Sequence, residues 1–124
     1  MSKPAFSLWV FSLYMFALGA TLVVAPNVLL TLFGVPETHE VWIRIVGMLV
    51  LIVGYLDFMA SRHELRIFFA WTVPPRLCVP VFLATFVILG WAPPILTLFG
   101  ASDAAGALWT AALLRGEKSP SAAR

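Results

Sequence analysis

Residues 41–60 read VWIRIVGMLVLIVGYLDFMA, a segment that is apolar apart from Arg44 and Asp57. A membrane-spanning α-helix needs about 20 predominantly apolar residues, and this segment has that length. Charged side chains are costly inside a bilayer and usually face protein or a water-filled cavity. We therefore predict a transmembrane helix over Val41–Ala60, with Thr38 available as its N-cap.

The composition of the whole chain agrees with a membrane protein. Of its 124 residues, 61% are hydrophobic and 11% are charged, whereas an average soluble domain has about 25% charged residues. A soluble domain of this size could not cover its surface with polar groups, and a disordered chain needs higher polarity. The basic residues flank apolar segments and form no continuous basic stripe, which argues against nucleic acid as a partner.

The charge-free run before this helix predicts a first helix over Ser7–Ala25, disturbed at Pro26-Asn27. The run could be read as a signal peptide, because Lys3 provides a basic start. Its apolar stretch is longer than the roughly 7–15 residues of a cleaved signal, so we interpret it as a signal anchor.

Two further helices are predicted after residue 60. Ile67–Pro75 is expected to lead along the interface into a helix over Arg76–Trp91, because Pro74-Pro75 interrupts the pattern. A short helix is expected over Asp103–Leu114, with Asp103 as its N-cap. The fold class is therefore all-α: a four-transmembrane-helix bundle in one domain, residues 1–115, followed by a polar tail, 116–124, that we expect to be disordered.

The basic residues predict the topology. Seven of the eight precede the first helix, lie between the second and third, or follow the fourth: Lys3; Arg62, Arg66 and Arg76; Arg115, Lys118 and Arg124. The exception, Arg44, lies just inside the second helix. The positive-inside rule then places both termini and the middle connection in the cytoplasm. We expect the chain to be integral to the cytoplasmic (inner) membrane, with the lipid bilayer as its first partner.

A short string recurs in the two halves of the chain. Thr31–Gly34 and Thr97–Gly100 both read TLFG, and each is followed three residues later by an acid, Glu37 or Asp103. Chance recurrence in a low-diversity apolar sequence is the alternative explanation. We interpret the matched flanks as two copies of one helical hairpin, residues 7–60 and 67–115, with each glycine as a helix C-cap.

One side of the Val41–Ala60 helix is suited to packing against protein. Gly47, Gly54 and Ser61 recur every seven residues, and small residues allow helices to approach closely in membranes. Ser12 and Gly19 in the first helix have the same spacing and are predicted to face them. The rest of the helix is apolar and is predicted to face lipid: Val41, Trp42, Ile45, Val46, Met48, Leu49, Ile52, Val53, Tyr55, Leu56, Met59 and Ala60.

Asp57 lies on the small-residue side and should find a basic partner. We predict Arg76, with Arg66 as the second choice, and leave two interpretations open: a structural clamp between helices, or a functional polar site. At the other end, Arg44 is expected to pair with Glu40 four residues earlier. An outer polar cluster is predicted there, formed by Glu37, His39, Glu40, Arg44 and Asp103.

Neither a metal nor another cofactor is predicted. The outer cluster has suitable oxygen and nitrogen atoms, but its members lack the tight spacing of a metal site and lie in solvated loops. Cys78 cannot form a disulfide within the chain and lies among apolar neighbours, so packing is preferred over a reactive thiol.

The small size, the Ala-Pro and Leu-Phe-Gly strings before an acidic turn, and the run Trp42–Gly47 (WIRIVG) resemble the DoxX-like group of small bacterial membrane proteins. The resemblance covers most of residues 8–115. It implies a four-helix bundle, and some such proteins resemble subunits of membrane oxidoreductases. It carries over no catalytic residue, because no catalytic motif of the chain matches.

Three functions stay open. The first is a non-enzymatic accessory, assembly or structural subunit that contacts other membrane proteins or itself. The second is a binding or redox-associated site for a lipophilic molecule such as a quinone, built on Asp57 and Arg76 or on the outer cluster. The third is a small self-associating transporter. No catalytic residue is predicted, because the sequence contains no phosphate-binding loop, no Ser/His/Asp set and no Cys/His pair.

Overall fold

The computed structural model of the chain describes residues 1–117, and all regular structure within them is helical. The prediction of an all-α protein is therefore confirmed. The elements in chain order are α1 (Lys3–Val24), α2 (Pro26–Leu32), α3 (Trp42–Arg62), α4 (Arg66–Ile88), the short 3₁₀-helix η1 (Pro94–Leu96) and α5 (Thr97–Glu117).

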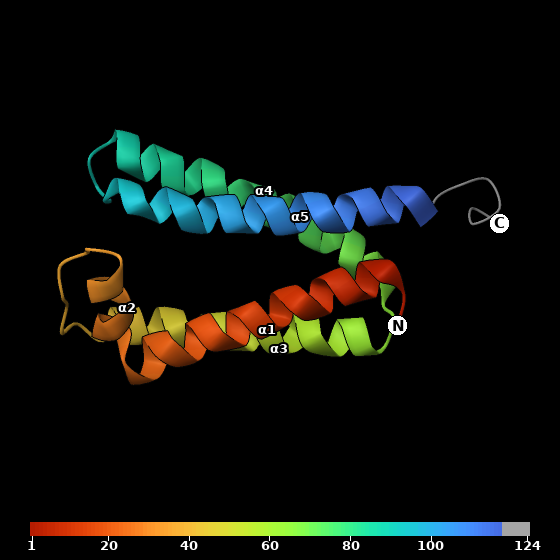
Figure 1. Cartoon of the computed structure of the whole chain (residues 1–124), viewed down its shortest axis with the longest axis horizontal. Helices are drawn as coiled ribbons and strands as arrows, with labels where there is room; N and C mark the ends of the chain where they lie inside the picture. Colours follow the sequence, from red (N-terminus) through yellow and green to blue (C-terminus); the bar gives the residue numbers. More distant parts are fainter. Residues whose placement is uncertain (118–124) are drawn as a thin grey trace. The chain divides into compact units, whose positions relative to one another are not determined.

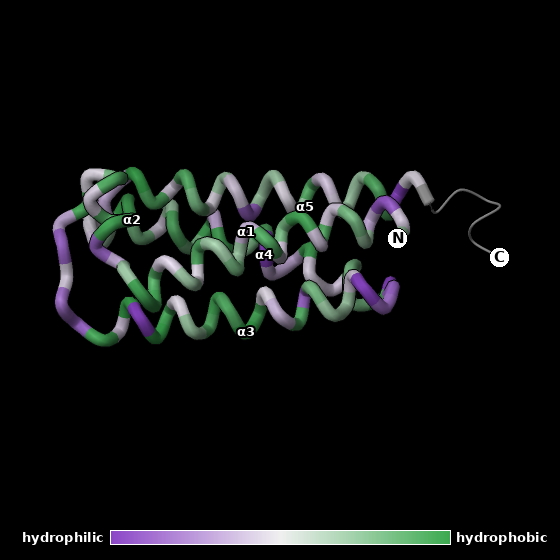
Figure 2. Tube along the Cα trace, turned by 60° about the horizontal axis from the view of Figure 1, so that its bottom comes forward, coloured by the Kyte–Doolittle hydropathy of each residue, from purple (hydrophilic) through white to green (hydrophobic). Residues whose placement is uncertain are grey.

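Four of the described segments are long and apolar enough to cross a membrane: Lys3–Val24, Trp42–Arg62, Arg66–Ile88 and Pro94–Gly116. The fold is thus that of a polytopic membrane protein with four spans, as predicted. Figure 2 shows hydrophilic residues in the connection between α2 and α3 and at other helix ends, while apolar residues dominate the long helices.

Contacts between Cα atoms divide the chain into two compact units, which we describe separately. The α1–α3 unit contains residues 9–59. The α4–α5 unit contains residues 1–8 and 60–124, described here up to residue 117. These limits differ from the predicted halves, because the first turns of α1 belong with α4 and α5.

In the α1–α3 unit, α1 and α3 run side by side (Figure 1) and approach most closely at two glycines. A Cβ atom on Gly47 would lie 2.7 Å from the Cβ of Leu22 and 2.9 Å from the carbonyl oxygen of Gly19. A Cβ on Gly19 would meet the Gly47 oxygen at 2.9 Å. Gly54 is less crowded, since its Cβ would lie 3.2 Å from the Cβ of Met15.

The opposite side of α3 is exposed along its length. Its large apolar side chains are between 45% and 66% accessible, as in a surface that lipid covers: Trp42, Val46, Met48, Leu49, Ile52, Val53, Tyr55 and Leu56. Ala60, which we assigned to this side, is instead 3% exposed and belongs to the core of the α4–α5 unit. The difference arises at the end of α3, where the chain enters the other unit.

The α4–α5 unit is an antiparallel helical hairpin joined by η1 (Figure 1). Gly100 of α5 lies against α4, and a Cβ there would be 2.8 Å from the Cα of Pro80. The beginning of α1 and the end of α3 complete the unit. Its core combines residues from α1, α3, α4 and α5: Ala5, Leu8, Ala60, Phe69 and Leu114.

Helix α4 begins ten residues earlier than predicted, at Arg66. Pro74, Pro75 and Pro80 lie inside it, although each removes a backbone hydrogen-bond donor. In an apolar medium, breaking the helix would expose still more backbone groups that have no water to bind. The expected interfacial segment 67–75 is therefore wrong, because the helix continues through the prolines.

Helix α5 also begins earlier, at Thr97, so Asp103 lies inside the helix and is not its N-cap. The predicted equivalence of Gly34 and Gly100 as C-caps fails for the same reason. Gly34 has φ +71° and ends α2 with a Schellman pair of hydrogen bonds, whereas Gly100 lies in the first turns of α5. The predicted tail likewise starts too early, since residues 116 and 117 end α5; residues 118–124 lie outside the described part.

Candidate polar site in the α4–α5 hairpin

Arg76 is a charged residue in the middle of a span. It lies ten residues after the start of α4 and twelve before its end, and it is 6% exposed. At about 1.5 Å per residue, it is roughly 15 Å from the beginning of the helix. We predicted it at a helix start near the interface, which is wrong because α4 begins at Arg66. A buried arginine at this depth is costly and usually functional or firmly paired.

The guanidinium of Arg76 folds back along its own helix onto Thr72. Its Nη2 donates to the Thr72 hydroxyl over 3.0 Å, and its Nε donates to the Thr72 carbonyl oxygen over 3.3 Å. The Thr72 hydroxyl in turn donates to the carbonyl oxygen of Phe69 over 2.7 Å. This i to i−4 arrangement directs the arginine's charge along α4, and it could not be read from the sequence because Thr72 was expected outside the helix.

Asp103 on α5 lies within electrostatic range of Arg76. The helix register agrees: Gly100 contacts Pro80, Asp103 follows Gly100 by about one turn, and Arg76 precedes Pro80 by about one turn. Because α4 and α5 are antiparallel, one turn forward along α5 and one turn back along α4 reach the same level of the hairpin. Asp103 is half-buried. The structure therefore places opposite charges on the two helices of one hairpin, where the sequence had assigned Asp103 to the outer cluster.

Asp57 is 3% exposed and lies on the side of α3 that faces away from the exposed apolar residues. It belongs to the α1–α3 unit, whereas Arg76 and Arg66 belong to the α4–α5 unit. Its pairing with Arg76, or with Arg66 as the second choice, stays a prediction. Of the other predicted packing residues, Ser12 lies fully buried in α1 and donates to the carbonyl oxygen of Trp9 over 2.6 Å, and Ser61 is fully buried at the end of α3.

Arg44 has a role that the sequence did not indicate. Its Nη1 donates to the carbonyl oxygen of Val23 and, over 3.4 Å, to that of Val24. The last carbonyl groups of a helix have no partner within the helix and carry partial negative charge. Arg44 therefore caps the end of α1, and the expected pairing with Glu40 is wrong.

The remaining members of the predicted outer cluster lie in the connection between α2 and α3. Glu37, His39 and Glu40 are exposed there. The connection is held by side chains, because the Thr38 amide donates to Asn27 Oδ1 over 2.9 Å and the Glu40 amide donates to the Thr38 hydroxyl over 3.3 Å. Thr38 thus orders this connection and does not cap α3. Among residues 1–117, no group of three or more His, Cys, Asp or Glu is placed to hold a metal ion.

A second polar contact was not predicted from the sequence. The hydroxyls of Ser7 and Thr110 lie 2.8 Å apart, and both residues are fully buried. Ser7 also donates to the carbonyl oxygen of Pro4 over 2.7 Å. The contact links the beginning of α1 to α5. Small hydroxyl residues are common in membrane helices, so their type alone did not single out this pair.

No family model, curated protein or solved structure matches the chain. The resemblance to the DoxX-like group therefore stays a prediction from the sequence.

Proposed function

We propose that this protein is an accessory or assembly subunit that acts through contacts with other proteins inside a membrane. The observation that supports the proposal is the character of the fourth span. Pro94–Gly116 is the least apolar of the four spans, and most of it is not buried within the chain. A span of this kind is poorly suited to lipid on its exposed sides.

The exposed sides of α3 and α5 differ in a way that agrees with this proposal. The exposed side of α3 consists of large apolar residues, such as Leu49 and Ile52. The exposed positions of α5 combine the small residues Ala101, Ala105 and Ala112 with large apolar ones, Leu98, Leu108 and Trp109. Asp103 on the same helix is half-buried. Small residues favour helix–helix contact in membranes, and a carboxylate there favours protein over lipid.

A photoreactive amino acid tests the proposal in native membranes. We expect one placed at Ala105 to form adducts of defined protein mass, whereas one placed at Leu49 on α3 forms adducts with lipid only. The Leu49 position is the matched control, because it is exposed on a long apolar helix of the same chain. Lipid adducts alone at Ala105, or equal protein adducts at both positions, would contradict the proposal.

The charged residues of α4 and α5 favour a second candidate, a binding site for a lipophilic molecule such as a quinone. Arg76 offers a guanidinium at mid-span and Asp103 a half-buried carboxylate beside it, and few polar groups in an apolar setting suffice to orient such a ligand. If this is correct, a short-chain quinone should raise the thermal unfolding midpoint of the parent protein in detergent but not that of Arg76→Gln. An equal shift in both proteins, or no shift in either, would contradict it.

A further inference from the structure

The connection between α3 and α4 contains a residue in an unusual backbone conformation. Glu64 has φ +55°, and within residues 1–117 it is the one non-glycine residue with positive φ. It occupies the position after the C-cap of α3, with hydrogen bonds from its amide to the Ser61 carbonyl oxygen (3.4 Å) and from the Leu65 amide to that of Ala60 (3.0 Å). Gly90 occupies the same position after α4, with φ +78°. Glycine is the usual residue at this position because a Cβ is disfavoured there.

The beginning of α1 lies against this connection. Ser2 is the N-cap of α1, because its hydroxyl accepts a hydrogen bond from the Ala5 amide over 3.2 Å. The Ser2 amide itself donates to Oε2 of Glu64 over 2.8 Å. In a capping box, a glutamate at the third helical position accepts that same amide hydrogen bond. Here the third position is Ala5, and Glu64 accepts the bond from a distant part of the chain.

The carboxylate is held in its charged form at this position. The hydroxyl and then the amide of Ser2 lower the pKa of Glu64 below its ordinary value, with smaller contributions from the amino group at residue 1 and from Arg66. A negative charge next to the beginning of α1 also complements the positive end of the helix dipole.

We propose that Glu64 is a clasp: it completes the capping box of α1 from the α3–α4 connection and so holds the beginning of α1 on the α4–α5 unit. The first turns of α1 contribute Ala5 and Leu8 to the core of that unit and Ser7 to the hydrogen bond with Thr110. Release of the clasp would free those residues. The clasp also explains why a glutamate stands where glycine would suit the backbone better.

The clasp is tested by substitutions at Glu64 and at Gly90, the equivalent position after α4. In a Cys78→Ser background, Ser7→Cys places a thiol at a fully buried site, and its rate of maleimide labelling reports opening of the first turns of α1. We expect Glu64→Gly to raise that rate by roughly threefold to tenfold, a size typical for loss of one capping interaction at a helix N-terminus. Gly90→Glu, the control at the equivalent position after α4, adds backbone strain to the hairpin without touching Ser2, so it should raise the rate less than Glu64→Gly does.

Unfolding in detergent adds a second measurement. Glu64→Gly removes backbone strain, so if Glu64 were not a clasp this substitution should raise the unfolding midpoint. If Glu64 is a clasp, the same substitution should lower the unfolding midpoint. Glu64→Gln keeps an acceptor oxygen and should label at a rate between those of the parent and Glu64→Gly. A labelling rate in Glu64→Gly equal to or below that of the parent, together with a raised midpoint, would overturn the clasp.

Discussion

The role of Arg44 depends on which acceptor atoms lie within reach of its guanidinium. The sequence favoured Glu40, because oppositely charged residues four apart on a helix attract each other. In the structure Glu40 precedes the beginning of α3, and the arginine donates to the last carbonyl groups of α1. The last carbonyl groups of a helix lack partners within the helix, so the arginine satisfies acceptors that residues within α1 cannot.

Substitutions at these two positions should therefore behave differently. Arg44→Leu should lower the free energy of unfolding by about 0.3–1 kcal/mol, the usual contribution of a cation at a helix C-terminus. Glu40→Gln should leave it within about 0.3 kcal/mol of the parent. Chemical unfolding in a mild detergent measures both. Equal losses of unfolding free energy in the two variants would instead support pairing between Glu40 and Arg44.

Arg76 and Asp103 should be energetically coupled. Arg76→Gln or Asp103→Asn alone leaves one charge without its counterpart at mid-span, and the double variant leaves neither. We expect a coupling free energy of about 0.5–2 kcal/mol from the four proteins of a double-mutant cycle. Additive losses would show that the two charges do not interact. The same cycle with Asp57 in place of Asp103 tests the pairing predicted from the sequence.

The charge of Glu64 should contribute to stability only where its carboxylate is ionised. Because its pKa lies below the ordinary value of 4.5 in the folded chain, its contribution is present above pH 4.5 and is lost as the pH falls through the lowered value. The charged groups that face it are the amino group at residue 1 and Arg66. The difference in unfolding midpoint between the parent and Glu64→Gln should thus be constant from pH 7 to pH 5 and should shrink as the pH falls through the lowered pKa. A difference that grows as the pH falls below 4.5 would exclude the carboxylate as its source.

At the level of elements, the glycines serve two separate purposes. Gly34 and Gly90 end helices in a left-handed conformation with nothing within 4 Å of an added Cβ. Gly19 and Gly47 lie inside helices and allow two backbones to approach. Gly100 allows α5 to lie against Pro80 of α4. The TLFG string shows the consequence, since one copy ends α2 and the other begins α5.

Alanine substitutions should separate crowded from open glycines. Gly47→Ala places a methyl group 2.7 Å from Leu22, so α1 and α3 must move apart, and we expect a loss of about 1–3 kcal/mol. Gly116→Ala in α5 meets nothing within 4 Å and should be neutral or stabilising by up to about 1 kcal/mol. Thermal unfolding in detergent compares the two. A neutral Gly47→Ala would show that the helices are not in close contact at this glycine.

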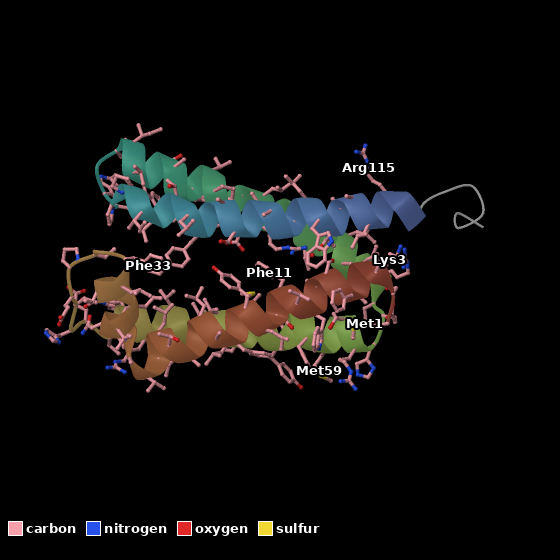
Figure 3. The ribbon with its side chains drawn as sticks, in the orientation of Figure 1. Met1, Lys3, Phe11, Phe33, Met59 and Arg115 are labelled. Atoms are coloured by element: carbon pink, nitrogen blue, oxygen red, sulfur yellow. The ribbon has the colours of Figure 1, made fainter. Side chains whose placement is uncertain are left out.

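For the molecule as a whole, the four spans place the connections alternately on the two sides of a membrane. Figure 3 shows Lys3 at the first turn of α1 and the side chain of Arg115 projecting outward near the end of α5. Basic residues near span ends favour the cytoplasmic side. We accordingly propose that both termini are cytoplasmic.

Thiol labelling of intact cells tests this topology. In a Cys78→Ser background, His39→Cys between α2 and α3 should react with a membrane-impermeant reagent. His63→Cys between α3 and α4 should react only after the cells are opened. Both histidines are exposed, so access to the side chain itself does not differ. The reverse pattern would invert the topology.

Composition and hydropathy were enough to predict an all-α chain with four spans, because the bilayer requires long apolar helices whatever their packing. The exposed apolar side of α3 could also be predicted, since the helical period separates its large apolar residues from its small and charged ones. A side chain that faces the bilayer needs no particular partner elsewhere in the chain, so the local pattern of apolar residues is enough to predict its position. These features therefore depend on sequence alone.

The partners of the polar side chains depended on contacts between distant segments. Arg44 reaches the end of α1, Asp103 comes beside Arg76, Ser7 meets Thr110, and Glu64 accepts a hydrogen bond from Ser2. The beginnings of α4 and α5 were likewise misplaced, because proline and aspartate favour helix boundaries locally. Inside an apolar medium, an interrupted helix leaves backbone groups unsatisfied, and that penalty outweighs the local preference.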